Sequence, residues 1–124
     1  MEYLCREQIL QKFTGYDKIE EALNSKRFIV IKCREFKFYV FKGLKRDYIV
    51  APCRFCTCDD FVINYLSRKR ENPCYHVVGF KIAEKVNKVV ELEVDSKILA
   101  KIVEEIVYEG FSSTLRKLLK VHQP

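Results

Sequence analysis

The first half of the chain changes from a helical to an extended pattern of apolar residues. Over residues 5–13 and 16–24, apolar side chains recur every three or four positions, and Gly15 separates the two segments. From Arg27 to Ala51, apolar and aromatic residues instead form short runs that alternate with charged turns. The pattern predicts two short helices and then a three-stranded antiparallel meander, with strands near residues 28–31, 36–40 and 48–50.

Amphipathic segments in the second half follow residues that are suited to starting helices. Asp59-Asp60 predict a helix that packs on the meander. Pro73 favours another helix, because proline is well tolerated at a first helical position. A third helix follows Asp95-Ser96 and ends at Gly110, and a short one covers residues 111–119. The helix after Asp59-Asp60 contains two i, i+4 apolar pairs, Phe61 with Tyr65 and Val62 with Leu66.

Two closely spaced pairs of metal-binding residues flank the first of these helices. Cys56-Thr57-Cys58 and Cys74-Tyr75-His76 are separated by 15 residues. Zn²⁺ takes thiolate and imidazole ligands in a tetrahedral arrangement, and two segments that each supply two ligands complete such a site. The C-x-C step can turn both sulfurs towards one ion, and Cys74 and His76 would lie on the first turn of a helix. The spacing predicts a zinc site with the ligands Cys56, Cys58, Cys74 and His76.

The same residues give the chain a resemblance to a known family. The runs from Cys56 to Phe61 and from Cys74 to Gly79 resemble the SWIM zinc finger, whose pattern is C-x-C, a variable helical spacer and C-x-H. The resemblance covers residues 46–86 and implies the same four zinc ligands. A short chain with little beyond the finger is most similar to the SWIM subunit of the Shu recombination complex and its archaeal relatives. This implies a RecA-family paralogue as partner and a role in DNA recombination and repair.

Together these patterns predict an α+β fold: a small antiparallel three-stranded meander with a zinc-stapled helical finger and flanking N- and C-terminal helices. We expect one compact domain, with an N-terminal helical segment over residues 1–25, the meander and finger over 26–88, and a C-terminal helical segment over 89–124. A chain of 124 residues with 48% apolar residues can build a core without disulfides. It shows neither a secretory pattern nor a membrane span, so we expect an intracellular protein in an archaeal cytoplasm or a eukaryotic nucleus.

The remaining cysteines have other interpretations. Clustered spacing favours metal over a disulfide framework, and we expect Cys5 and Cys33 to be small buried hydrophobic residues. Cys53 forms a C-x-x-C with Cys56, but a thioredoxin-like redox pair would open a helix within a βαβ unit. A zinc deaminase is excluded, because it needs a histidine upstream of its cysteines and the first histidine is His76. We predict that Cys53 is a neighbour of the zinc site; the alternative is that it replaces His76 as a ligand.

Basic charge is concentrated around the predicted finger. The net charge is +6, and residues 26–88 hold 15 basic and six acidic residues, whereas residues 89–109 hold two basic and six acidic ones. A basic surface attracts phosphate and is expected of a protein that binds single- or double-stranded DNA. The alternative is that these cations protect an edge strand or stabilise helix ends. The candidate DNA contacts are Lys42, Lys45, Arg46, Arg54, Arg68, Lys69 and Arg70.

Two further surfaces have both a packing and a binding interpretation. Strand alternation sends Phe36, Phe38 and Val40 to the core, and it leaves Tyr39 and Phe41 as candidate stacking residues for bases. The helix after Asp95 has a wide apolar stripe, which indicates either burial against the meander or docking of a partner. The candidate partner-binding residues on this stripe are Ile102 and Ile106.

Three classes of function are compatible with the sequence. We favour a non-catalytic zinc-finger subunit that acts in recombination through its partner. A stand-alone nucleic-acid-binding module is the alternative. A thiol or zinc enzyme is disfavoured, because catalytic zinc keeps an open position for water and this site has four protein ligands. We therefore do not expect catalytic residues.

Overall fold

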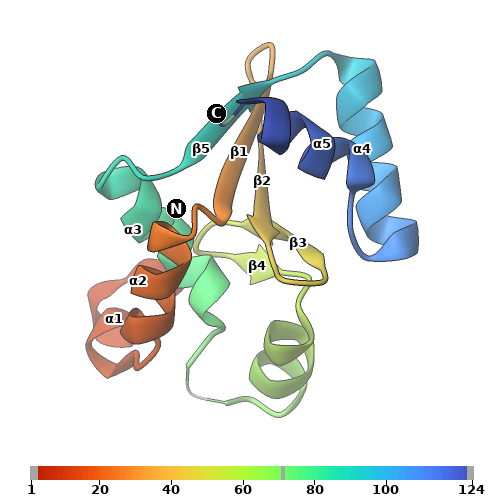
Figure 1. The fold of residues 1–124 in the computed structure, drawn as a ribbon. Coiled ribbons are helices and arrows are strands. Elements are labelled where there is room, and N and C mark those ends of the chain that lie inside the picture. Colours follow the sequence, from red (N-terminus) through yellow and green to blue (C-terminus); the bar gives the residue numbers. More distant parts are fainter. Residues whose placement is uncertain (1–2, 71, 123–124) are drawn as a thin grey trace.

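The centre of the molecule is a five-stranded mixed sheet in a computed structural model that describes residues 3–70 and 72–122 (Figure 1). The strands are β1 (Phe28–Cys33), β2 (Phe36–Lys42), β3 (Asp47–Ala51), β4 (Phe55–Cys56) and β5 (Val90–Glu93), in the order β4-β3-β2-β1-β5. The helices are η1 (Tyr3–Cys5), α1 (Glu7–Lys12), α2 (Tyr16–Asn24), η2 (Asp60–Ser67), α3 (Tyr75–Lys85), α4 (Ser96–Glu109) and α5 (Ser113–His122). The fold class is α+β, as predicted.

The sheet is larger than the predicted three-stranded meander. Strands β1, β2 and β3 pair antiparallel in chain order, but β4 adds two residues beside β3. Strand β5 pairs parallel with β1, where Ile29 lies opposite Val90 and Ile31 lies opposite Leu92. Both additional strands are short, and their apolar residues lie next to charged or cysteine-rich segments. The pairing of β5 with β1 is non-local, and the two residues of β4 are too few to give a strand pattern in the sequence.

Strand β1 is apolar throughout because both faces of the sheet are covered. Phe28 and Val30 pack with α2 and α3 on one face, whereas Ile29 and Ile31 pack with α4 and α5 on the other. All four side chains are at most 1% exposed. A strand covered on both faces has a continuous apolar run in place of alternation. Figure 1 shows α1, α2 and α3 on one side of the strands and α4 and α5 on the other.

Because both faces of the sheet are covered, the burial of side chains in β2 differs from the prediction. Val40 is buried, as expected, but Phe41 is only 2% exposed and belongs to the core under α3. Phe36, at the far end of the strand, is 57% exposed. The prediction that Phe41 is an exposed stacking residue is therefore wrong, because it assumed that one face of the meander faces solvent. Tyr39 is half-buried and its ring contacts Phe80.

Helix ends agree with the sequence where capping residues determine them. Asp95 caps α4 by accepting a hydrogen bond from the Ile98 amide at 2.9 Å, and Gly110 ends it in the left-handed region with a φ of 86°. Helix α3 begins at Tyr75 with Cys74 as its N-cap, two residues after the predicted start at Pro73. Within the residues covered by the structure, no helix is long and apolar enough to cross a bilayer.

The apolar stripe of α4 is used by the protein's own core. Ile102 is fully buried and Ile106 is 6% exposed, in the cluster that α4 and α5 form against β1. These two side chains are therefore not accessible to a partner, and the predicted docking surface does not exist at them. Val107 and Tyr108 are the large apolar residues of α4 that are exposed.

A buried ion pair attaches α5 to the hairpin between β2 and β3. The Asp47 side chain is fully buried and accepts a hydrogen bond from Arg116 Nη2 at 2.7 Å and another from the Ser112 amide at 2.8 Å. Arg116 also donates to the Gly43 carbonyl at 3.2 Å. The backbone amide of Asp47 donates to Gly110 at 2.8 Å. The hairpin is thus fixed to the turn between α4 and α5 by side chains and backbone.

We predict that Asp47→Ala lowers the free energy of unfolding by about 3 kcal/mol, because it leaves a partly buried guanidinium without its carboxylate. Urea denaturation followed by circular dichroism measures the change. Glu91→Ala is the matched control: it removes the exposed pair between Lys32 and Glu91 and should cost less than about 1 kcal/mol. Equal effects of the two substitutions would contradict the role assigned to Asp47.

Candidate metal centre

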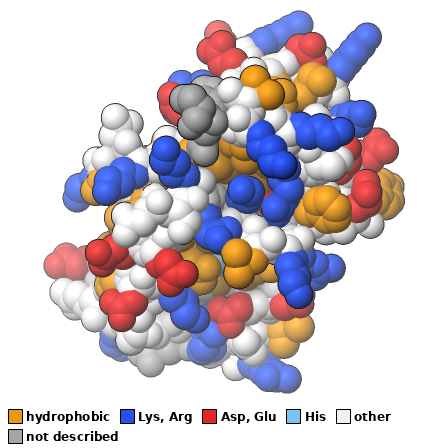
Figure 2. Space-filling model, viewed as in Figure 1, with side chains coloured by type: hydrophobic (Ala, Val, Ile, Leu, Met, Phe, Trp, Pro, Cys, Tyr) orange, Lys and Arg blue, Asp and Glu red, His pale blue; other side chains and the backbone are white. Residues whose placement is uncertain are grey.

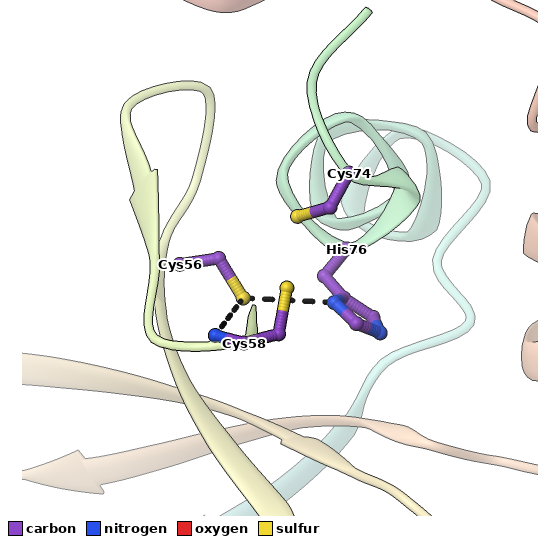
Figure 3. A group of neighbouring side chains, drawn as sticks. All are labelled: Cys56, Cys58, Cys74 and His76. Atoms are coloured by element: carbon purple, nitrogen blue, oxygen red, sulfur yellow. Dashed lines mark hydrogen bonds between the residues drawn. The ribbon is translucent and has the colours of Figure 1, made fainter. Parts of the chain in front are cut away.

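Four predicted ligands come from two segments that the sheet brings together. Cys56 ends β4, and Cys58 follows it just before η2. Thr57, between them, is held on β3: its amide donates to the Ile49 carbonyl at 3.1 Å, and its hydroxyl accepts from the Ile49 amide at 3.0 Å. With Thr57 fixed in this way, both neighbouring sulfurs lie on the side that faces α3 (Figure 3).

The second pair of ligands lies at the start of α3. Cys74 is its N-cap residue and His76 is in its first turn. Figure 3 shows the Cys74 sulfur and the His76 ring facing the two sulfurs of the C-x-C segment. The start of the helix therefore presents one thiol and one imidazole to the C-x-C segment, as the sequence predicted.

The four side chains form one buried cluster of suitable size for a metal ion. Their ligand atoms all lie within 4.8 Å of one another, and each side chain is buried. Cys56 Sγ lies 3.5 Å from His76 Nδ1. Tetrahedral Zn²⁺ with Zn–S bonds of about 2.3 Å would space its ligands about 3.8 Å apart. A small contraction of the cluster would therefore produce a closed four-coordinate site.

The thiols of this cluster have strongly different proton affinities. Hydrogen bonds from Cys56 and Cys74 stabilise a thiolate on Cys58 and lower its pKa. The same hydrogen bonding and burial raise the pKa of Cys56. At Cys74, the hydrogen bond with Cys56 lowers the pKa, but the bond with Cys58 and burial prevail and raise it to about 12. The small buried volume that the three sulfurs share disfavours several negative charges at once.

Neither acidic residue near the ligands is placed for catalysis. Asp59 is exposed. Asp60 accepts two hydrogen bonds from Arg70, at 2.6 and 2.7 Å, and these bonds lower the pKa of its carboxyl. A carboxylate held by a guanidinium is a poor general base at neutral pH. The four side chains could supply all four positions around a tetrahedral ion.

Cys53 lies outside the metal-ligand cluster, as predicted, but its structural role was missed. It forms a disulfide with Cys5 and so links η1 to the loop between β3 and β4. The amide of Leu4 donates to the Cys53 carbonyl at 2.7 Å beside this bond. The expectation that Cys5 is a free buried thiol is therefore wrong, whereas Cys33 is buried and free. A separation of 48 residues gives no sequence signal for this pair.

The candidate DNA contacts fall into separate regions of the structure. Lys42, Lys45 and Arg46 lie on or beside the β2–β3 hairpin, above the metal cluster. Arg54 lines a different hollow with Lys81 and Lys85. Arg68 and Lys69 are exposed after η2, and Arg70 is paired with Asp60. The hairpin residues and Arg54 each line hollows that contain other basic residues, but these hollows are separate.

Sequence reasoning missed three cations that join this hairpin group. Arg27 lies just before β1 and donates from Nη1 to the Lys42 carbonyl at 2.9 Å. Arg116 and Lys120, one turn apart on α5, line a hollow together with Lys42. Figure 2 shows Lys and Arg side chains gathered across the middle of this face, between α2 and α5. The +3 charge of residues 110–124 was visible in the sequence, but its proximity to the hairpin depends on the tertiary fold.

In comparisons with known proteins, no family model, curated sequence or solved structure matches the chain. The resemblance to a SWIM-type finger therefore stays a prediction from the ligand residues and their spacing.

We predict that Cys58→Ser abolishes stoichiometric zinc binding and lowers the melting temperature, because metal binding and folding of the finger are coupled. Zinc content by atomic emission and thermal denaturation measure the two effects. Cys33→Ser is the matched control, since Cys33 is a buried free cysteine outside the cluster and should retain full zinc content. Full zinc content in the Cys58→Ser protein would show that Cys58 is not a ligand.

We also predict that zinc binding releases two protons at neutral pH. Cys56 and Cys74 both have a raised pKa and are thiols before the metal binds, whereas all bound cysteines are thiolates. Each released proton makes zinc affinity increase about tenfold per pH unit, so two protons give about 100-fold. Zinc titration in weakly buffered solution measures the release directly. Binding without proton release would mean that the thiols were already ionised.

Proposed function

We propose that this chain is a non-catalytic, zinc-stabilised SWIM-like finger protein that binds nucleic acid and acts in DNA recombination together with a RecA-family partner. The observation that carries the proposal is the position of two hairpin cations: Lys45 and Arg46 line the same hollow as His76, a member of the buried Cys₃His cluster. A metal bound there would hold β4 and α3 together and thereby fix the shape of the basic surface. Zn²⁺ is the metal that best suits three thiolates and one imidazole in a tetrahedral site.

The cations are arranged to receive phosphate. Arg27, Lys42 and Arg116 lie around the same hairpin backbone, and hydrogen bonds to its carbonyls hold both guanidinium groups. Neutralising backbone phosphates supplies most of the free energy of non-specific nucleic-acid binding. Asp47 compensates one of these charges, so the group keeps a net positive charge that favours a polyanion.

A partner surface is supported at the finger and not at α4. Phe55, Val62, Ile63 and Leu66 are 38% to 49% exposed on β4 and η2. Helix η2 is a π-helix, and its wider turn leaves Val62 and Leu66 away from the sheet on which we expected them to pack. Grouped exposed apolar side chains are typical of protein contact sites. We propose this face for the RecA-family partner, whereas the hairpin face binds DNA.

We predict salt-dependent binding of the isolated protein to both single- and double-stranded DNA, measured by fluorescence anisotropy across salt concentrations. Three or four phosphate contacts would give a log–log slope of about −2 to −3 on single strands. Lys42→Gln should weaken binding and reduce the magnitude of the slope by about 0.7. Lys97→Gln, an exposed lysine of α4 outside the hairpin group, is the control and should change neither quantity.

Repeating these titrations with a co-purifying RecA-family partner distinguishes a recombination subunit from a stand-alone nucleic-acid-binding module. Tighter binding with the partner supports a recombination subunit, whereas unchanged affinity supports a stand-alone module. Salt-independent binding, or binding that is unaffected by Lys42→Gln, would contradict the phosphate-binding role of the hairpin.

A further inference from the structure

A pocket with aromatic walls opens beside the metal cluster. Its volume is about 490 Å³, within the range of small-molecule sites, and it lies between the β2–β3 hairpin, α2 and the start of α3. The side chains of Phe41, Tyr48, Tyr75 and His76 form its aromatic lining. Arg27, Lys45 and Arg46 also line it, with Glu21 of α2 as an acidic lining residue.

Contacts with His76 hold the two tyrosine rings in place. Tyr48 stacks on His76 with ring centroids 5.3 Å apart, and Tyr75 lies 4.3 Å from the same ring. Phe41 contacts His76 from the core side at 4.2 Å. Both tyrosines are half-buried, so each ring is supported by the protein and partly open. Such fixed aromatic surfaces can stack a base without regard to its sequence, because every base has a π-face.

A second hollow of about 440 Å³ lies on the α5 side of the hairpin, and its charged lining residues are all cations. It is lined by Lys42, Arg116, Leu119 and Lys120. Burial and then repulsion by Arg116 and Arg27 lower the pKa of the Lys42 ammonium, which indicates a local excess of positive charge. An anion bound here would relieve that repulsion. The two hollows share no lining residue, but Arg27 of the aromatic pocket donates a hydrogen bond to the carbonyl of Lys42, which lines the second hollow.

We propose that these two hollows form one binding site for an unpaired nucleotide of single-stranded nucleic acid. The base stacks on Tyr48 or Tyr75 in the aromatic pocket, and its flanking phosphate binds Lys42, Arg116 and Lys120. Glu21 would repel phosphate from the α2 side, and this places the phosphate towards α5. The inference rests on the proposed nucleic-acid binding and specifies its substrate as single strands with accessible bases.

The metal ligand His76 is also a lining residue of this pocket. Its Nδ1 faces Cys56, whereas its other ring nitrogen, Nε2, points away from the three sulfurs (Figure 3). A neutral imidazole that binds metal through Nδ1 carries its proton on Nε2, so this atom is a hydrogen-bond donor. With a metal bound at Nδ1, His76 would offer a nucleotide in this pocket one polar contact in addition to stacking and charge.

The test compares a fluorescent oligothymidylate with an abasic phosphodiester of equal length, because both have the same charge and only the first has bases. We expect the oligothymidylate to bind about 5- to 150-fold more tightly, as one or more stacked bases would give. Tyr75→Leu should remove most of this difference and leave abasic binding unchanged. Tyr75→Phe keeps the ring and is the matched control, which should bind as the unmodified protein does.

Zinc content and melting temperature establish that each variant is folded. Photo-crosslinking of the unmodified protein to an oligonucleotide with 5-iododeoxyuridine gives an independent measurement, and we expect the adduct on Tyr48 or Tyr75. Oligouridylate tests whether RNA binds, and thymidine monophosphate tests whether a free nucleotide binds. Tight binding of either single strand supports the site, whereas equal affinity for the mononucleotide would overturn the assignment to single strands.

Failure of this inference is distinguishable from failure of the proposed function. Equal binding of the oligothymidylate and the abasic strand, with crosslinks outside the pocket, would overturn the nucleotide site and leave phosphate binding intact. If neither probe binds in a salt-dependent way, nucleic-acid binding itself is overturned.

Discussion

The constraint on which the rest of this structure depends is the convergence of Cys56, Cys58, Cys74 and His76 in one buried cluster. Three thiols in so small a volume cannot all ionise without a cation, and hydrogen bonds from Cys56 and Cys74 lower the pKa of Cys58. A divalent ion removes that repulsion and also fixes β4 and α3 relative to each other. The first turn of α3 carries Tyr75 and His76, whose rings contact Phe41 and Tyr48 of the hairpin strands. Formation of the cluster thereby determines the shape of the surface above it.

The second support of the hairpin comes from the other face of the sheet. Asp47 joins it to α5 through Arg116 and to the α4–α5 turn through Ser112. An ion pair whose carboxylate is buried gives little net stability relative to an apolar pair. It does favour one specific pairing of side chains, because a buried charge without its partner is costly. Here the pair holds Arg116 beside Lys42, so that a contact inside the fold also positions a cation at the surface. The hairpin is thus held by aromatic rings on one side and by an ion pair on the other.

The sequence predicted features that depend on a few adjacent residues, but it did not predict features that join distant parts of the chain. The ligand spacing and the Asp95 cap of α4 are properties of a few adjacent residues, and both were identified. The Cys5–Cys53 disulfide, the parallel pairing of β5 and the position of Arg116 each depend on residues far apart in the chain. Phe41 was misjudged because the sheet is covered on both faces, and for the same reason the burial interpretation of the α4 stripe holds at Ile102. At η2 the local prediction holds for Phe61 and Tyr65, which pack in the core, but Val62 is 38% and Leu66 is 49% exposed.

The position of His76 connects the two roles assigned to this surface. One ring nitrogen belongs to the metal cluster, while the ring as a whole supports Tyr48 and Tyr75 and lines the pocket between them. Two ligands that favour the same orientation of one side chain must strengthen each other's binding by the same factor, since coupling free energy is reciprocal. A nucleotide that accepts a hydrogen bond from Nε2 would stabilise the metal-bound orientation of the ring, and the metal would prepare the pocket for the nucleotide. On the proposed function, the metal centre is then part of the nucleic-acid surface as well as of the fold.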